Sequence, residues 1–325
     1  MGERDKGERG PFKVGVVTAA IPFDDRDLAV ELWYPSCGGD SHEEDRFTPY
    51  PGAPEVVQSA ARHAEMLEDG NFPLLLFSHG GLSHRRAMSH LCTHAASHGY
   101  VVASLDHPGS LYSEYLAALQ GQPATLTSAD SAKRRPRELV ALVKAVRSGR
   151  LGVKASTRRI GSFGASFGGW TALQAATELK ELASVVALVP AFGEGPLIET
   201  LDLTRTFSTD WVARPDVLLV AGEFDAFVPP NNVRALFERL AEPKRLEVIA
   251  DVGHNHFVDG AEQIHELLRT LFQSGMLKPT NPNYADINMA GLLRPFGSMM
   301  READAHLLVR RLLVAHMDKA LKRHL

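Results

Sequence analysis

Cysteine is scarce in this chain of 325 residues, where only Cys37 and Cys92 occur. Two cysteines are too few for a disulfide scaffold and lack the spacing of a zinc site, so we expect a reduced, cytoplasmic protein. The N-terminus lacks the apolar core of a secretory signal, and no stretch approaches the roughly 18 consecutive apolar residues of a membrane span. We therefore expect no membrane span.

An excess of positive charge is also absent. The chain has 35 Lys and Arg against 39 Asp and Glu, a formal net charge of −4, which excludes a global basic field for nucleic acid or an anionic membrane. Apolar residues make up 44% and charged residues 23%, so the chain can bury a sizeable core. The expected partner is a small molecule, bound by a monomer or a homodimer.

Short apolar runs alternate with longer amphipathic stretches, which is typical of α/β proteins with a mostly parallel sheet covered on both faces. We expect one domain over 12–325, preceded by a tail at 1–11. The predicted strands lie at about 12–19, 27–34, 73–78, 100–105, 159–163, 184–189, 217–221 and 245–250, and the predicted helices near 86–98, 136–149, 168–180, 231–241, 258–273 and 301–323.

Three connections, at about 36–71, 107–135 and 274–300, are too long to be simple loops. The first is polar and acidic, and we interpret it as a surface excursion. The other two carry enough apolar side chains to pack over something, so they are candidate lids. The last helix has apolar residues at helical spacing, and we expect it to pack on the domain rather than to form a dimer seam.

The clearest motif is G-x-S-x-G at residues 164–168, between an apolar strand and a helix-forming segment. Serine at the apex of such a sharp turn sits in strained backbone, and Gly164 and Gly168 keep the chain narrow enough to pass. The turn presents the hydroxyl of Ser166, and the helix N-terminus behind it favours developing negative charge. The sequence therefore predicts Ser166 as a nucleophile.

A hydroxyl is a weak nucleophile, so a base held by an acid must lie elsewhere in the chain. In this arrangement the order is Ser, Asp, His. Asp225 follows the buried strand at 217–221, and His254 follows the next strand in a loop. We predict Ser166, Asp225 and His254 as a catalytic triad.

Rivals exist for two of these roles. His256 competes with His254 but adjoins the next helical run, where a packing role is commoner, and an H-x-H metal pair lacks further ligands. Glu223 would point to the opposite side of an extended chain from Asp225, and Asp251 lies on the strand end of the histidine itself. We predict no metal and no cofactor.

The oxyanion of the reaction needs donors that are already in place. The strand at 73–78 ends in His-Gly-Gly, so the backbone N–H groups of Gly81 and Phe167 are the predicted oxyanion hole. His79 precedes the serine and is interpreted as a residue that fixes the loop. Trp170, Tyr112 and Leu82 are expected to contact the substrate.

With these motifs in order, the span 12–325 resembles the α/β-hydrolase superfamily, and within it the dienelactone-hydrolase-like and platelet-activating-factor acetylhydrolase-like esterases. The resemblance implies an α/β-hydrolase fold, whose sheet has eight strands by the apolar runs above, and cofactor-free hydrolysis of carboxylic esters through an acyl-enzyme. The stretches that carry it are Ala29–Pro35, Leu76–Gly81, Ala96–Ala103, Ser166–Gly169 and Gly253–Phe257.

The chain departs from both groups. In the acetylhydrolases the acid follows the strand after the elbow, which falls here near Val189–Ala191, where no carboxylate occurs. Dienelactone hydrolases use a cysteine where this chain has Ser166. We therefore expect a general esterase for short- to medium-chain acyl or aryl esters. A lipase, a polyester hydrolase or a phospholipid acetyl-hydrolase needs the same triad, and a cofactor-free lyase or an inactive binding module could share the scaffold.

Overall fold

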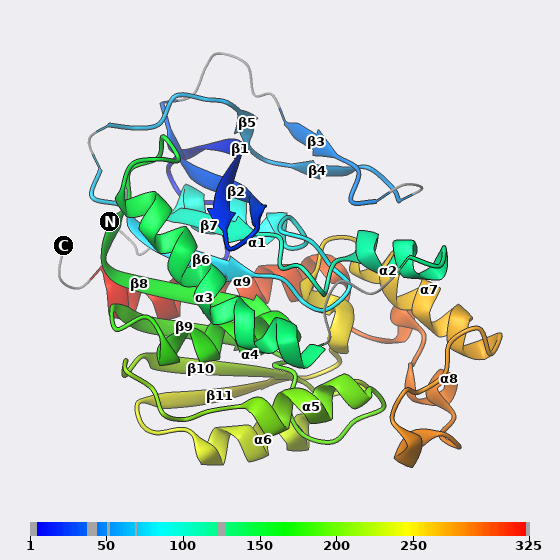
Figure 1. Cartoon of the computed structure of the whole chain (residues 1–325). Helices are drawn as coiled ribbons and strands as arrows, with labels where there is room; N and C mark the ends of the chain where they lie inside the picture. Colours follow the sequence, from blue (N-terminus) through cyan, green and yellow to red (C-terminus); the bar gives the residue numbers. More distant parts are fainter. Residues whose placement is uncertain (1–4, 38–43, 51–52, 69, 123–127, 323–325) are drawn as a thin grey trace.

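The computed structural model describes residues 5–37, 44–50, 53–68, 70–122 and 128–322, and a nine-stranded sheet forms its centre (Figure 1). The strand order is β11-β10-β9-β8-β6-β7-β2-β1-β5. The eight predicted strands are confirmed, and the very short β5 adds a ninth. The bounds are β1 (Lys13–Phe23), β2 (Arg26–Ser36), β5 (Ala61–Arg62), β6 (Pro73–Ser78), β7 (Val101–Leu105), β8 (Ser156–Ala165), β9 (Leu182–Leu188), β10 (Asp216–Gly222) and β11 (Lys244–Ile249).

The sheet is parallel from β7 to β11, whereas β2 runs antiparallel to both β7 and β1. Central parallel strands are covered on both faces and so read as unbroken apolar runs. Strand β6 is buried at all six positions, which explains why its sequence predicted a strand so clearly. The parallel arrangement brings the carboxyl ends of β6, β8, β10 and β11 to one edge of the sheet.

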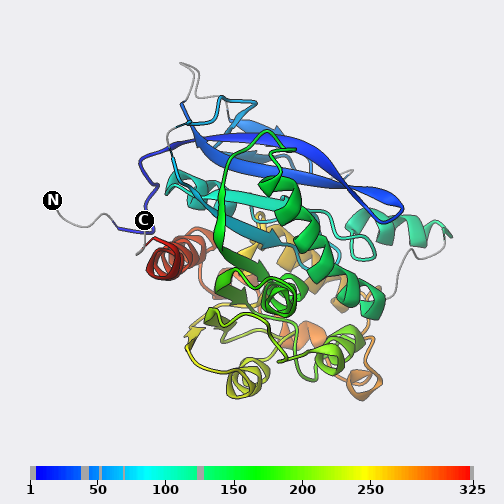
Figure 2. The same ribbon diagram turned by 60° about the vertical axis from the view of Figure 1, so that its left-hand side comes forward.

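Helices cover both faces of the sheet (Figure 2). Helices α3, α4, α5 and α6 bury apolar residues in a core on one face, whereas α1 and α9 do so on the other. The six predicted helices are confirmed, with α3 beginning eight residues before the expected 136. The bounds are α1 (Ser89–Ser97), α2 (Tyr112–Leu119), α3 (Ser128–Arg147), α4 (Phe167–Gln174), α5 (Ile198–Thr206), α6 (Pro230–Arg239), α7 (Ala261–Gln273), α8 (Met289–Leu292) and α9 (Glu302–Leu321).

The connection 36–71 is more than a surface excursion. It contains β3 (Asp45–Phe47) and β4 (Val56–Gln58), which pair as a separate antiparallel hairpin, and it also supplies β5 of the main sheet. The hairpin lies beyond the β1 edge and extends over the same side of the molecule as α2 (Figure 1). Gln58 is buried and Asp45 nearly so, which explains why a polar sequence here is nonetheless ordered against the domain.

The terminal segments pack against each other. In the tail, Gly10 donates to Ser97 of α1, and Lys6 pairs with Asp318 of α9 at 2.6 Å. Helix α9 buries Val309, Leu313 and other apolar residues in the core shared with α1. Among the described residues, no helix combines the length and apolarity needed to cross a membrane.

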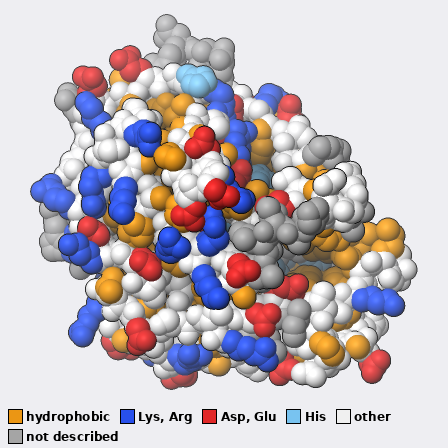
Figure 3. Space-filling view, in the orientation of Figure 1, with side chains coloured by type: hydrophobic (Ala, Val, Ile, Leu, Met, Phe, Trp, Pro, Cys, Tyr) orange, Lys and Arg blue, Asp and Glu red, His pale blue; other side chains and the backbone are white. Residues whose placement is uncertain are grey.

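On the face shown in Figure 3, basic and acidic side chains are interspersed, and apolar side chains gather at the right, where α2 and α7 lie.

Candidate active site

Ser166 occupies the sharp turn between β8 and α4, as the motif predicts. Its φ of 57° and ψ of −122° are strained for a residue with a side chain. A Cβ atom at Gly164 or Gly168 would overlap the carbonyl oxygen of Ser78, so both positions require glycine. Strand β6 and the start of α4 can approach this closely only because neither position has a side chain.

Asp225 and His254 meet beyond the ends of β10 and β11. The Nδ1 atom of His254 lies 2.7 Å from Oδ2 of Asp225. The other carboxylate oxygen, Oδ1, accepts hydrogen bonds from the N–H groups of Phe227 at 2.9 Å and Val228 at 2.8 Å. The Asp225 side chain is fully buried, whereas 15% of the His254 side chain is exposed. The carboxylate is therefore fixed, and the Nε2 side of the imidazole remains available for chemistry.

Ser166 and His254 both line one cavity of about 740 Å³. This volume lies within the usual range for small-molecule sites, about 300–1,000 Å³. The Ser166 hydroxyl makes no hydrogen bond to the His254 ring within the described part of the chain. Catalytic hydrogen bonds of this kind often tighten only when substrate binds.

The rival residues lie in different surroundings. His256 is fully buried, its Nδ1 accepts from Gly253 N–H at 3.1 Å, and its Nε2 lies 3.1 Å from the carbonyl oxygen of Met300. Both nitrogens are thus engaged away from the cavity. Glu223 accepts from the N–H of Asp251 at 3.1 Å instead of approaching His254. Across the described ranges, no three His, Cys, Asp or Glu side chains are grouped to hold a metal ion.

The two predicted oxyanion donors are Gly81, in the loop after β6, and Phe167, which directly follows Ser166. Gly81 lines the cavity, and nothing lies within 4 Å of where its Cβ would be. Phe167 is the first residue of α4, where backbone N–H groups have no partner inside the helix. Neither N–H donates to an acceptor among the residues the structure describes. Both are free to receive a developing negative charge.

His79 is fully buried behind this loop, and so does not contact substrate. Its Nε2 accepts from the N–H of His107 at 2.9 Å, and its Nδ1 lies 2.8 Å from the carbonyl oxygen of Gly80. Burial lowers the pKa of His79 well below its usual value, so the ring is neutral. This placement agrees with a residue that fixes the loop.

A second chain of serine, histidine and acid runs beneath the same loop, and no motif in the sequence indicates it. The Oγ atom of Ser78 lies 2.8 Å from Nε2 of His107, and Nδ1 of His107 lies 2.7 Å from Oε2 of Glu138. All three residues are completely buried, so no substrate reaches them. Burial raises the pKa of Glu138 to about 7. This chain therefore supports the end of β6 and does not form a second reaction centre.

Part of the cavity wall comes from the connection 36–71, which was expected to be a surface excursion. The hairpin contributes Phe47 and Val57, and the adjoining Tyr50 packs against Tyr112 of α2 with ring centroids 4.1 Å apart. Leu82 also lines the cavity and is 55% exposed, as expected for a residue at its mouth. One side of the cavity is thus apolar and aromatic.

Trp170 is not among the lining residues, contrary to expectation. It is 3% exposed, and its Nε1 donates to the carbonyl oxygen of Leu203 at 2.9 Å. It points into the core between α4 and α5. No residue of 274–300 lines the cavity either, because Met289 and Leu293 pack against Phe227 beside α7. Residues 123–127 of the first lid candidate lie outside the described residues.

The part of the cavity wall around His90 and His306 is polar but carries little unpaired charge. His90 and His306 stack with ring centroids 3.5 Å apart, and burial lowers the pKa of His306 to about 4. Asp259 accepts from the N–H groups of Ser89 and His90, and Glu302 accepts from that of Gly260. The imidazoles are neutral at pH 7 and the carboxylates already have donors, so this side suits an uncharged ligand.

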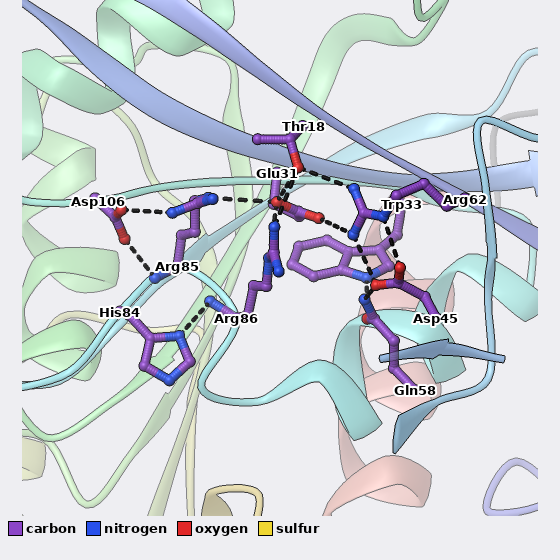
Figure 4. A network of polar contacts seen from close by, with 10 residues as sticks. All are labelled: Thr18, Glu31, Trp33, Asp45, Gln58, Arg62, His84, Arg85, Arg86 and Asp106. Carbon is purple, nitrogen blue, oxygen red and sulfur yellow. Dashed lines mark hydrogen bonds and ion pairs between the residues drawn. The ribbon is translucent and has the colours of Figure 1, made fainter. Parts of the chain in front are cut away.

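A buried polar network fastens the hairpin to the sheet (Figure 4). Its centre is Glu31 of β2, a fully buried carboxylate that contacts three arginines. Arg62 joins Glu31 to Asp45 of the hairpin, with distances of 2.9 Å and 2.6 Å. Arg86 contacts Glu31 at 3.0 Å and also lines the cavity. One carboxylate therefore links the cavity wall and the loop after Leu82 to the sheet.

Comparison with solved structures confirms that the chain has the α/β-hydrolase fold. A ferulic acid esterase from Streptomyces cinnamoneus is 20% identical, with a TM-score of 0.65, over 97% of this chain and 92% of that one. A protein described as a dienelactone hydrolase from Klebsiella pneumoniae is 15% identical, with a TM-score of 0.50, over 87% of this chain and 98% of that one.

Residues 47–118 match the family model of platelet-activating factor acetylhydrolase, isoform II. The matched segment contains β4, β6, the Gly81 loop, α1, β7 and α2, which together supply much of the cavity wall. The predicted resemblance to acetylhydrolase-like and dienelactone-hydrolase-like esterases is therefore confirmed. No curated protein matches the chain.

Proposed function

We propose that this protein is a serine hydrolase that cleaves uncharged carboxylic esters through Ser166, His254 and Asp225. One observation carries the proposal: a strained serine and a histidine held by a buried aspartate face the same cavity. The match to the acetylhydrolase family and the similarity to a ferulic acid esterase support a carboxylic ester hydrolase.

In the proposed mechanism, Ser166 Oγ attacks the ester carbonyl while Nε2 of His254 takes its proton. Asp225 keeps the proton of the neutral ring on Nδ1 and stabilises the imidazolium. The N–H groups of Gly81 and Phe167 hold the oxyanion. When the intermediate collapses, His254 protonates the leaving alcohol. Water activated by the same histidine then releases the acid and restores Ser166.

The cavity favours short- to medium-chain acyl or aryl esters. Its volume of about 740 Å³ accommodates a ligand of that size, and its apolar wall includes Phe47, Tyr50 and Tyr112. Aromatic rings prefer tilted or offset contacts with other rings, as Tyr50 and Tyr112 already make with each other. An aryl ester would extend this pair.

The proposal is tested with an organophosphonate and with p-nitrophenyl esters. With the organophosphonate, wild-type protein is expected to gain the mass of one phosphonyl group on Ser166. With the p-nitrophenyl esters, it is expected to release acid and p-nitrophenol. Ser166→Ala should lose the adduct, and kcat/KM should fall by about 10⁴ or more. His256→Gln is the matched control for His254→Gln, since only His254 contacts Asp225. Folded wild type without adduct or hydrolysis would instead indicate a binding module.

A further inference from the structure

Arg135 is a completely buried cation directly behind the Gly81 loop. Its guanidinium donates to the carbonyl oxygen of His79 at 2.8 Å and to that of Gly80 at 3.4 Å. The same group donates to the hydroxyls of Ser110 and Thr171. The planar guanidinium therefore donates hydrogen bonds to two successive carbonyl groups of the loop. A lysine ammonium cannot do this in the same geometry.

His79 contacts the carbonyl group of Gly80 as well, through one of its two ring nitrogens. Because the N–H of His107 donates to Nε2 of His79, that nitrogen carries no proton, and the proton of the neutral ring is on Nδ1. Nδ1 therefore donates to the carbonyl oxygen of Gly80 at 2.8 Å. This oxygen thus accepts two hydrogen bonds from side chains that are both fully buried.

The Gly80 carbonyl and the Gly81 N–H belong to one planar peptide unit. Fixing the oxygen fixes the direction of the N–H, and hydrogen bonding at the oxygen polarises the N–H toward a better donor. We infer that Arg135 and His79 are positioning residues that hold the Gly80–Gly81 peptide so that Gly81 N–H stabilises the oxyanion. This inference rests on the proposed ester hydrolysis.

Arg135 also places a positive charge beside Phe167, the residue whose N–H is the second donor. Its guanidinium lies over the ring of Phe167, 3.7 Å from the centroid, and the nearby carboxylates of Glu138 and Glu114 offset part of its charge. Burial lowers the pKa of Arg135 to about 9, so the group is charged at pH 7. A buried positive charge stabilises negative charge that develops nearby, since screening by water is weak there.

Arg135→Met and Arg135→Lys test the inference with p-nitrophenyl butyrate as substrate. Loss of one oxyanion donor costs about 10²–10³ in rate, and a misdirected donor should cost less, so we expect kcat to fall about 10- to 100-fold. KM should stay within about threefold, because the oxyanion forms only after binding. Arg135→Lys keeps the charge without the fork, so it decides the question should Arg135→Met fail to fold.

A trifluoromethyl ketone provides a readout that a merely structural role would not move. It forms a tetrahedral oxyanion on the serine, so its inhibition constant should rise by the same factor as kcat/KM falls. Thr171→Val is the matched control, because it removes a buried hydrogen-bond partner of Arg135 at 3.2 Å but leaves the hydrogen bonds from Arg135 to both loop carbonyls. Its kcat should stay within about threefold of wild type. A folded Arg135 variant with unchanged kcat, or with a loss confined to KM, would overturn the inference. Inactive wild type would refute the proposed function itself.

Discussion

Replacing Glu31 by glutamine removes the central charge of the network in Figure 4 while preserving the size of the side chain. Glu31 is fully buried and accepts a hydrogen bond from Thr18 at 2.9 Å. Its carboxylate also contacts Arg62 at 2.9 Å, Arg86 at 3.0 Å and Arg85 at 3.3 Å. Three guanidinium groups would lose a shared partner in a single substitution.

The size of the effect follows from what each arginine retains. Removing one partner of a buried ion pair typically costs 3–5 kcal/mol. Arg62 keeps Asp45 and Arg85 keeps Asp106, and the three arginine side chains are only 17–28% exposed. Partial exposure permits some rehydration. We therefore expect a loss near the low end, about 3 kcal/mol in the free energy of unfolding.

Urea denaturation of both proteins at pH 7 measures this loss. Glu55→Gln is the control, because its ion pair with Arg46 has side chains 52% and 56% exposed and should contribute at most about 1 kcal/mol. The reasoning fails if Glu31→Gln costs no more than Glu55→Gln. Because Arg86 lines the cavity, Glu31→Gln should also lower kcat/KM.

Two further predictions concern the buried acid and the serine turn. Burial raises the pKa of Glu138 to about 7 from a usual 4.5, so the folded protein binds this proton more tightly and its stability falls as pH rises between those values. The free energy of unfolding, measured at pH 5 and pH 7, should rise for Glu138→Gln relative to wild type toward pH 7. The opposite trend would contradict the raised pKa of Glu138. Gly168→Ala should lower the free energy of unfolding by about 2 kcal/mol or more, because its Cβ would overlap Ser78. Gly81→Ala has open space around its Cβ and should have the melting temperature of wild type.

Local sequence signals were sufficient for the sheet and for the turn at Ser166. Apolar runs such as Pro73–Ser78 have no polar interruption. The glycines around Ser166 form a motif that is recognisable locally, although the contact that requires them is made with Ser78 of β6. Asp225 and His254 were also predictable, since each follows a buried strand and strand ends of a parallel sheet converge. Their contact at 2.7 Å agrees with that expectation, although their role in catalysis stays a prediction.

The cavity wall could not be predicted in the same way. Hairpin β3–β4 is held by hydrogen bonds between residues that are distant in sequence, such as Gln58 with Trp33 and Asp45 with Arg62. No local sequence pattern therefore predicts it. Trp170 was misassigned because adjacency to Ser166 in sequence does not decide which face of α4 a side chain occupies. The chain Ser78, His107 and Glu138 was missed since its members belong to three elements and only their burial distinguishes it.

The hairpin meets the sheet at one anchored corner, through Asp45 and Gln58, while Phe47 and Val57 face the cavity. The residues proposed to select the ester are therefore separate in the chain from Ser166, Asp225 and His254, which are proposed to cleave it. A library confined to positions 46–57, with Asp45 and Gln58 kept, can be screened for new substrates without altering Ser166. Protein engineers would thus be able to vary one short segment, 46–57, while the residues proposed for catalysis stay unchanged.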